Sequence, residues 1–277
     1  MVPLMARQTF RRPEDPQGRS VPPRLDLTRA ENFLQILPPR LPRFEMGQHA
    51  PQWELVQPLG VGGFGEVWLG RHTFLPEQRA FKFCLDARFQ QRLLRHEGEV
   101  VRRIQQMKDR FPADGHGIAW LLDAYVEGET PWLAYEYVEG GDLVGVIQKL
   151  AGWEASQRGQ LALKYLWVLA RIVGQFHRLE PPIVHRDLKP ANVLVRATGR
   201  GRVLRVTDFG ISQWAAEQAL AESRVQSRDV TQCSLVRGAY TPLYASPQQR
   251  RGEGADPRDD VYSLGVIGWQ MMVGDVS

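Results

Sequence analysis

The chain has 277 residues, of which 43% are hydrophobic, and this is enough for a folded domain with a buried core. It contains only two cysteines, Cys84 and Cys233, and neither belongs to a CxxC or Cys/His cluster, which argues against a disulfide framework and a zinc site. The formal net charge is +4, and most of this surplus lies in the first 52 residues. Charge therefore gives no reason to expect that the folded part binds nucleic acid.

The first 52 residues hold nine of the nineteen prolines, so we predict a Pro/Arg-rich and mostly disordered extension. Within it, Thr28 to Glu31 has the spacing of a capping box before a short apolar run, which predicts one short helix. A solvated tail is favoured over contact with nucleic acid or anionic lipid. The sequence has no signal-peptide core and no apolar run long enough for a membrane span, and we expect a cytoplasmic protein.

From residue 53 onwards the pattern becomes β-like. Two strands, at 53–56 and 66–69, flank a run rich in glycine. Two of the expected helices, at 161–176 and 261–273, are apolar on most sides, so we place them in the interior of the domain. The other expected elements are a strand at 79–85, a helix at 90–107 and a strand at 133–138.

The glycine run, Gly60-Val61-Gly62-Gly63-Phe64-Gly65-Glu66-Val67, joins two strands. A dinucleotide-binding glycine loop lies instead between a strand and a helix, so this context argues against that fold. Glycines allow backbone N–H groups to come close to phosphate oxygens, and the run is therefore a candidate phosphate cradle.

Further along are Ala80-Phe81-Lys82, then the loop sequence from His185 to Asn192, and then Asp208-Phe209-Gly210. The loop reads His-Arg-Asp-Leu-Lys-Pro-Ala-Asn, which combines a proton acceptor, cations and a metal-binding amide. Together with the glycine run, and in this order, these sequences resemble a eukaryotic-like protein Ser/Thr kinase of the bacterial type. The resemblance extends from about residue 53 to residue 277.

The resemblance implies an α+β, bilobal fold with a small β-rich lobe at about 53–138 and a helical lobe at about 139–277. We expect the second lobe to be incomplete after its central helix, because several more helices follow in kinases. One explanation is that the chain is part of a longer polypeptide with further C-terminal domains. The alternative is an unusually short lobe that leaves the apolar face of 261–273 exposed.

ATP and Mg²⁺ are the implied substrate and metal. Backbone groups of Glu136 and Val138 are expected to bind adenine, Asp142 to face the ribose, and Leu194 to lie beneath the base. Lys82 is expected to contact the α- and β-phosphates. The full set of expected nucleotide-binding residues is Leu59, Gly60, Val61, Gly62, Gly63, Phe64, Gly65, Val67, Ala80, Lys82, Glu136, Val138, Asp142 and Leu194.

In kinases a helix glutamate holds that lysine, and two candidates occur here, Glu97 and Glu99. We favour Glu97, because Val101 and Ile104 share its helix face and are apolar. Glu99 remains the alternative.

The resemblance assigns the catalytic base to Asp187, since a carboxylate must orient the attacking hydroxyl and receive its proton. Lys189 is expected to steady the γ-phosphate, and Asn192 and Asp208 to ligate Mg²⁺. His185 is expected to pack against Phe209 and Val101 rather than to act in catalysis. Asp260 is expected to brace the loop.

Lys189, two residues after the base, is typical of kinases that act on Ser or Thr. Thr241 matches the threonine that contacts the catalytic Asp and Lys in these enzymes. Ser212, Ser223, Ser227, Thr231 and Ser234 lie between Asp208 and Thr241, and a phosphate there would be a partner for Arg186. Both control by phosphorylation, including autophosphorylation, and a plain serine-containing loop remain open.

The sequence departs from the kinase pattern at Ser246-Pro247-Gln248, where the usual Ala-Pro-Glu has a carboxylate. Our hypothesis is an ATP-dependent protein Ser/Thr kinase that acts on protein substrates. The alternative is a nucleotide-binding pseudokinase, that is, a regulatory module of a larger protein. A small-molecule kinase is disfavoured by the combination of Lys189 with Thr241-Pro242-Leu243-Tyr244.

Overall fold

The computed structural model describes residues 44, 46, 50–61, 65–84, 90–106, 117–127, 130–199, 201–209 and 241–276. These residues form two compact units, each described here by itself. The small unit comprises the described residues of Met1–Leu94 and Leu121–Tyr137, and the large unit those of Arg95–Trp120 and Val138–Ser277. The helix expected near residue 30 lies outside the described residues.

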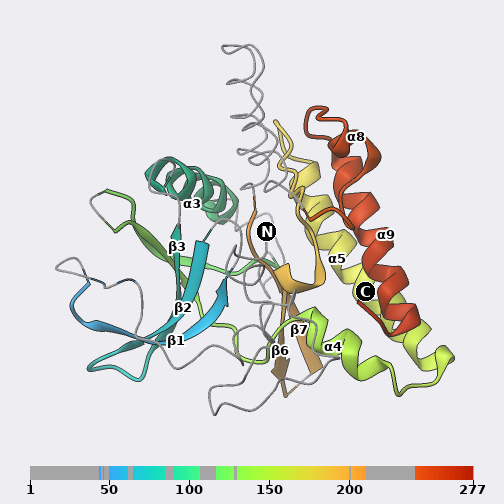
Figure 1. Ribbon diagram of the computed structural model, residues 1–277, viewed down its shortest axis with the longest axis horizontal. Coiled ribbons are helices and arrows are strands. Elements are labelled where there is room, and N and C mark those ends of the chain that lie inside the picture. Colours follow the sequence, from blue (N-terminus) through green and yellow to red (C-terminus); the bar gives the residue numbers. More distant parts are fainter. Residues whose placement is uncertain are drawn as a thin grey trace, which may run out of the picture. The chain divides into compact units, whose positions relative to one another are not determined.

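The small unit is built on one antiparallel sheet, which is coloured blue to green in Figure 1. Its strands are β1 (Trp53–Val61), β2 (Gly65–His72), β3 (Gln78–Cys84), β4 (Leu121–Tyr125) and β5 (Trp132–Glu136). They lie in the order β1-β2-β3-β5-β4. The glycine run therefore joins two strands that pair antiparallel, as predicted from its sequence context.

The two faces of this sheet differ in their chemistry because side chains alternate along each strand. Trp68 pairs with Phe81 across β2 and β3, and these aromatic side chains share one face. Val67 pairs with Lys82 on the opposite face. Gly70 also lies on the aromatic face, where an added Cβ would come within 2.3 Å of the Phe81 ring, so a larger residue there would displace that ring.

The aromatic face forms the hydrophobic core of the small unit. Phe81 lies at its centre, with its ring 5.2 Å from Trp53 and 5.3 Å from Trp132. Residues before β1 also contribute: the Phe44 ring stacks on Phe83 with 4.5 Å between centroids. The buried core residues are Met46, Ala50, Trp53, Leu55, Trp68, Phe81, Phe83, Trp132 and Ala134. Packing thus begins before residue 53, which the sequence pattern indicates as the start of the domain.

Helix α3 (Gln90–Gln106) spans the sequence boundary between the two units. The large unit consists mainly of helices, together with a two-stranded sheet. Its elements are α4 (Leu143–Leu150), α5 (Ala155–His177), the 3₁₀ helix η3 (Pro190–Asn192), β6 (Val193–Thr198), β7 (Gly201–Val206), α8 (Pro247–Arg250) and α9 (Pro257–Val273).

The sequence determines the ends of α9 clearly. Asp256 caps its N-terminus in a capping box with Asp259, and Pro257 occupies the first helical position. Gly274 ends the helix in the left-handed conformation, which a residue without a Cβ adopts easily. The first turn also contains Asp260, so its carboxylate lies at the positive end of the helix dipole.

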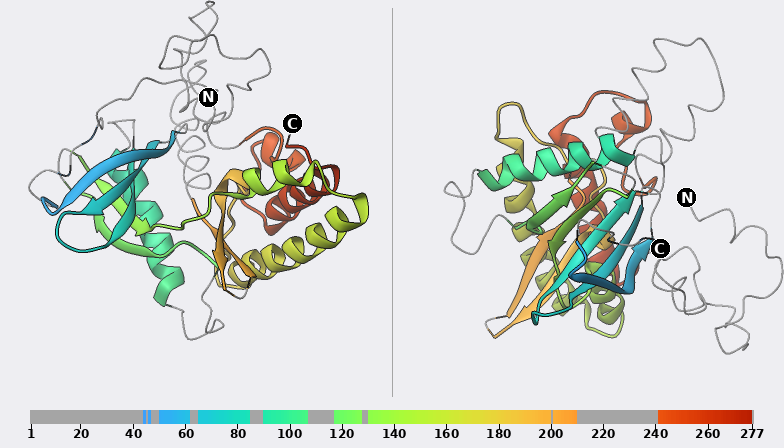
Figure 2. Two further views of the ribbon diagram at one scale, coloured as in Figure 1. Left: turned by 90° about the horizontal axis from the view of Figure 1, so that it is seen from below. Right: turned by 90° about the vertical axis from the view of Figure 1, so that its left-hand side faces the viewer.

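Helices α5 and α9 pack side by side, as Figures 1 and 2 show in yellow and red. Leu169 of α5 and Ile267 of α9 are both fully buried. The expectation that both helices are buried all round is wrong for the described part of the chain. Trp167 of α5 is 60% exposed and Trp269 of α9 is 65% exposed, so each helix has one buried face and one apolar exposed face.

Every strand and helix that the sequence predicted within the described residues is present. No helix among these residues is long and apolar enough to cross a membrane. The elements that the sequence reading did not predict are β4, α4, η3, β6, β7 and α8.

Candidate active site

The sequence from His185 to Asn192 forms a buried loop between α5 and the β6–β7 hairpin. His185 is fully buried, and its Nε2 lies 2.8 Å from the carbonyl oxygen of Thr207. Its ring packs 4.7 Å from that of Phe209, which in turn packs 4.9 Å from Phe176. These contacts support the expected packing role of His185.

Asp260 braces the loop, as predicted. Its Oδ2 accepts a hydrogen bond from the backbone N–H of His185, and its Oδ1 accepts one from Arg186, both at 2.9 Å. His177, the last residue of α5, lies 2.7 Å from Oδ2 through its Nε2. One fully buried carboxylate therefore ties α5, α9 and the loop together.

Two residues of the site adopt a backbone conformation that is uncommon outside glycine. Arg186 and Asp208 both have φ of 63°, in the left-handed region. A residue stays in this strained conformation only where the surrounding structure stabilises it. Such residues cluster at functional sites. Arg186 directly precedes the expected base, and Asp208 is an expected metal ligand.

Asp187 lies at the centre of a hydrogen-bond network. Its Oδ1 accepts from the backbone N–H and the hydroxyl of Thr241, at 3.0 and 2.9 Å. Its Oδ2 accepts from the ammonium of Lys189 at 2.8 Å, and the same ammonium donates to the Thr241 hydroxyl at 2.8 Å. The predicted contacts of Thr241 with the Asp and the Lys are therefore confirmed. The carboxylate thus accepts hydrogen bonds from two residues, and the cationic one, Lys189, partly neutralises it.

Asn192 is buried, and its side-chain Nδ2 donates to the Asp187 carbonyl at 2.9 Å. This bond uses the amide nitrogen and leaves the amide oxygen as the atom that would ligate a metal. Amide and carboxylate oxygens suit a hard ion such as Mg²⁺, so Asn192 and Asp208 fit this metal. In the described part of the chain no group of three or more His, Cys, Asp or Glu residues could hold a metal. Phosphate and water oxygens would have to complete the coordination.

Three of the expected nucleotide-binding residues of the small unit share one face of the sheet. Val67, Ala80 and Lys82 lie on the face opposite the aromatic core, and Lys82 is buried with 7% of its surface exposed. Gly60 and Gly65 lie on the paired strands β1 and β2. Residues 62–64, including the expected contributors Gly62, Gly63 and Phe64, lie outside the described residues.

The two candidate partners for Lys82 differ sharply in burial on α3. Glu97 is fully buried and shares its face with the buried Val101 and Ile104, whereas Glu99 is exposed. The buried face of α3 therefore contains Glu97, Val101 and Ile104, as the spacing of the apolar residues predicted.

Of the residues expected to bind adenine and ribose, Glu136 is the last residue of β5, and Val138 and Asp142 follow that strand. Asp142 caps the N-terminus of α4 by accepting from the Gly145 N–H at 3.0 Å, and it also forms a backbone bridge with Leu194. Gly140 has φ of 131°, and an added Cβ there would lie 2.3 Å from the Val195 carbonyl oxygen. The connector therefore requires glycine at this position.

A second polar network, which the sequence reading missed, lies beside the loop. It includes Ser246, whose hydroxyl donates to Asp259, and Gln249, whose amide donates to the Arg186 carbonyl at 2.7 Å. Ser246 caps α8, and a serine followed by a proline is a typical sequence signal for the start of a helix. Nothing in the local sequence indicated that the loop would contact these residues.

The comparison with protein families agrees with this geometry. The model of the protein kinase domain matches residues 53–277, so the chain belongs to the protein kinase family. The chain is also similar to bacterial serine/threonine-protein kinases. Two of these are from Myxococcus xanthus: pkn2 is 30% identical over 224 residues and Pkn1 is 31% identical over 232 residues. PknA of Mycobacterium tuberculosis is 29% identical over 240 residues.

These matches cover 80%, 83% and 80% of this chain, but only 24%, 30% and 47% of the three relatives. The chain therefore corresponds to about a quarter to a half of the length of the relatives it matches. The similarity places the chain in the eukaryotic-like kinase family of bacteria, with the bilobal fold expected from its sequence.

Proposed function

We propose that the chain is a protein Ser/Thr kinase domain that transfers the γ-phosphoryl group of ATP to Ser or Thr hydroxyls of protein substrates. The observation that carries this proposal is the Asp187 carboxylate, held by Lys189 and Thr241 at 2.8 to 3.0 Å. A fixed carboxylate beside a cation suits a group that orients a hydroxyl and receives its proton. The family membership of residues 53–277 supports the same assignment.

In the proposed reaction, the substrate hydroxyl oxygen forms a bond to the γ-phosphorus, and the bond from that phosphorus to the β,γ-bridging oxygen breaks to release ADP. The hydroxyl proton passes to Asp187. Lys189 offers its ammonium to the transferred group, and the Thr241 hydroxyl keeps both side chains in place. A bound Mg²⁺ would neutralise phosphate charge, with Asn192 and Asp208 as its protein ligands.

Nucleotide binding in this proposal depends on Lys82 for the phosphates and on backbone groups of Glu136 and Val138 for the base. The burial of Glu97, in contrast to the exposure of Glu99, supports Glu97 as the glutamate that holds Lys82. We propose that Asp142 also faces the ribose. Its carboxylate accepts a hydrogen bond from Gly145 at the N-terminus of α4. We also propose that the chain acts in the cytoplasm and phosphorylates itself.

The deciding experiment measures transfer of labelled γ-phosphate from Mg·ATP to the chain and to a generic basic protein. We expect label on Ser and Thr, and a loss of at least about a hundredfold in kcat for Asp187→Asn, because general acid–base groups contribute on this scale. Lys82→Met is expected to abolish detectable transfer. Asp123→Asn is the matched control, because Asp123 lies on β4 with an exposed side chain, and it should behave like the wild type.

Transfer that survives in Asp187→Asn would contradict the assignment of the base. Nucleotide binding without any transfer by the wild type would support the alternative of a non-catalytic, nucleotide-binding module. Transfer to small alcohols or amino sugars alone would place the chain among small-molecule kinases.

A further inference from the structure

Arg186 occupies a position where its conformation matters for the proposed base. Its φ of 63° is disfavoured for a residue with a Cβ, and the next residue is Asp187. A change of this backbone towards an ordinary conformation would turn the Asp187 carboxylate away from Lys189 and Thr241. Whatever holds Arg186 therefore also positions Asp187.

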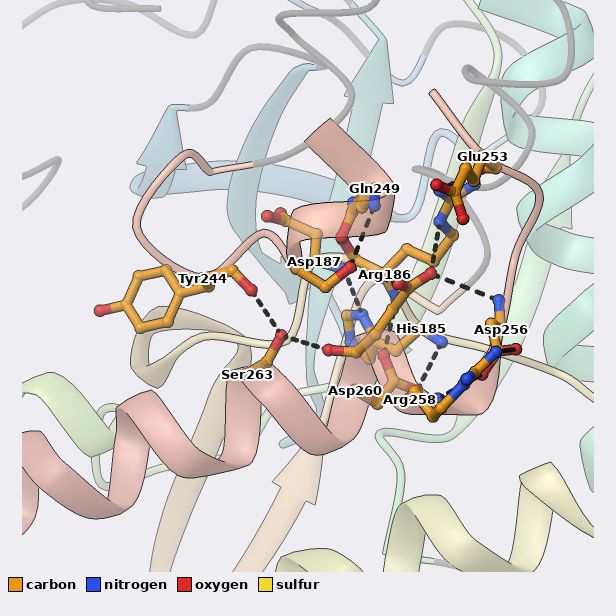
Figure 3. A network of polar contacts seen from close by, with 12 residues as sticks. His185, Arg186, Asp187, Tyr244, Gln249, Glu253, Asp256, Arg258, Asp260 and Ser263 are labelled. Atoms are coloured by element: carbon orange, nitrogen blue, oxygen red, sulfur yellow. Dashed lines mark hydrogen bonds and ion pairs between the residues drawn. The ribbon is translucent and has the colours of Figure 1, made fainter. Parts of the chain in front are cut away.

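Within the part of the chain that the structure describes, four contacts hold Arg186, and all of them come from residues 249–260. Its N–H donates to Asp260 at 2.9 Å, and its carbonyl accepts from Gln249 at 2.7 Å. Its Nη2 donates to the Glu253 carbonyl at 3.0 Å, and its Nε lies 3.2 Å from Oδ2 of Asp259. Figure 3 shows Arg186 enclosed between Gln249, Glu253 and Asp260.

Asp259 provides the charge partner in this set. Its side chain is fully buried, and that of Arg186 is only 3% exposed. Its Oδ1 accepts from the Ser246 hydroxyl and its Oδ2 from the backbone N–H of Asp256. The Nε–H of Arg186 is not directed at an acceptor, so the contact with Asp259 is an ion pair rather than a hydrogen bond. Two opposite charges buried together stabilise each other, whereas either alone would be costly.

We infer that Asp259 is a positioning residue for the transfer reaction: it supplies the permanent negative charge that holds Arg186 in its left-handed conformation and so fixes Asp187. The expected effect of Asp259 on kcat rests on the proposed kinase function. Since the counter-charge comes from α9, Arg186 needs no phosphate on residues 210–240. The sequence alone left that question open.

The first test compares Asp259→Asn with Asp256→Asn in steady-state transfer assays on the full chain. Asparagine keeps the shape and the hydrogen bond from Ser246 but removes the charge that Arg186 needs. We expect kcat to fall at least about tenfold, with KM for ATP changed less than about twofold, because the base is misplaced while the nucleotide-binding residues are intact. Asp256 belongs to the same helix terminus but pairs with Arg258, whose side chain is 81% exposed, so its variant should keep its kcat within about twofold.

Equal losses in both variants, or a wild-type kcat for Asp259→Asn, would overturn the inference. Phosphatase treatment of the wild type supplies a second arm. We expect treated protein to keep its kcat within about twofold, whereas a drop of more than about tenfold would show that a phosphate provides the charge for Arg186.

A third measurement does not need activity. Hydrogen exchange of the Arg186 and Asp187 amides should be at least about tenfold faster in Asp259→Asn, with exchange at Val195 in β6 unchanged. Unchanged exchange would overturn the inference even if the chain transfers phosphate. If the wild type transfers none, the proposed function fails, and this exchange result still decides the role of Asp259.

The double variant Arg186→Gln/Asp259→Asn guards against simple misfolding of the single variant. It leaves no buried unpaired charge, so it should fold and melt closer to the wild type than Asp259→Asn does. Its exchange at Asp187 should nevertheless stay fast and its kcat low. Wild-type exchange and kcat in the double variant would mean that the ion pair does not position the base.

Discussion

The pKa of the Asp256 carboxyl lies well below its ordinary value. Hydrogen bonds from the side chain and then from the backbone of Arg258 lower its pKa from 3.8 to about 2. The folded protein therefore keeps this carboxylate ionised at pH values where the unfolded chain protonates it. The resulting stability is fully present above about pH 4 and is lost as the pH falls towards 2.

We predict that Asp256→Asn lowers the melting temperature by about 1–2 °C near pH 6, because its partner Arg258 is 81% exposed and the ion pair is therefore weak. This difference from the wild type should shrink between pH 4 and pH 2, measured by circular dichroism in a series of buffers. In an Arg258→Leu background the effect of the same substitution should be smaller, because only the hydrogen bond from the backbone N–H of residue 258 to Asp256 remains. A difference that does not change with pH would contradict the assignment of this stability to the ionised carboxylate.

Thr241 offers a second test at the level of one residue. We predict that Thr241→Val lowers kcat about tenfold, because the hydroxyl that donates to Asp187 and accepts from Lys189 is lost. Thr241→Ser keeps the hydroxyl and should stay within about threefold of the wild type. Steady-state transfer rates decide, and equal rates for the valine and serine variants would show that the hydroxyl has no role.

Individual residues of the loop were predictable where the kinase pattern carries them. The pairing of Thr241 with Asp187 and the bracing by Asp260 follow from that resemblance and are present. The role of Asp259 could not be predicted, because the sequence does not distinguish it from the nearby aspartates Asp256 and Asp260. Only folding decides which of these three acids faces an arginine more than 60 residues away.

At the level of elements, the sequence predicted the long helices and missed the short ones, and it missed the strands β4, β6 and β7, although β6 and β7 are longer than the predicted β5. Residues of β7 include the buried Arg205, which interrupts the apolar alternation that identifies a strand. Helix α4 has only eight residues, too few for a clear helical period. The error on α5 and α9 has a different cause, since composition cannot tell which apolar face a helix will bury.

The segment before β1 is an element whose contribution can be measured. We predict that Phe44→Ala lowers the free energy of unfolding by about 1–3 kcal/mol, because the stacked ring over Phe83 is lost from a partly buried site. Urea denaturation followed by tryptophan fluorescence measures this change. Phe74→Ala is the matched control, since Phe74 is 94% exposed, and it should leave stability unchanged. Equal stability of the two variants would mean that the segment does not contribute to the core.

At the scale of the whole molecule, the residues proposed to bind ATP and Mg²⁺ belong to both units in the chain. Lys82 belongs to the small unit, and Asp208 belongs to the large unit. The sequence predicted both from their spacing within the kinase pattern, although their separation along the chain gives no physical reason for joint action. Ligand-dependent stability can test such joint action without any catalysis.

We predict that a non-hydrolysable ATP analogue with Mg²⁺, at about a hundred times its Kd, raises the melting temperature of the wild type by about 5 °C. Lys82→Met and Asp208→Asn should each remove most of this shift, and EDTA should reduce it in the wild type. Asparagine tolerates the left-handed φ of 63° at position 208, so Asp208→Asn tests the carboxylate charge rather than the backbone.

Glu54→Gln serves as the control, because Glu54 pairs only with the exposed Arg71 among the described residues. This variant should keep the full melting shift. If Lys82→Met removes the shift and Asp208→Asn retains it, the small unit binds the nucleotide without the metal ligands of the large unit, and the proposed Mg²⁺ role of Asp208 is wrong. If both variants retain the melting shift, the nucleotide binds elsewhere. The shift depends on the affinity for the ligand, so an unchanged shift means that neither side chain contributes to binding.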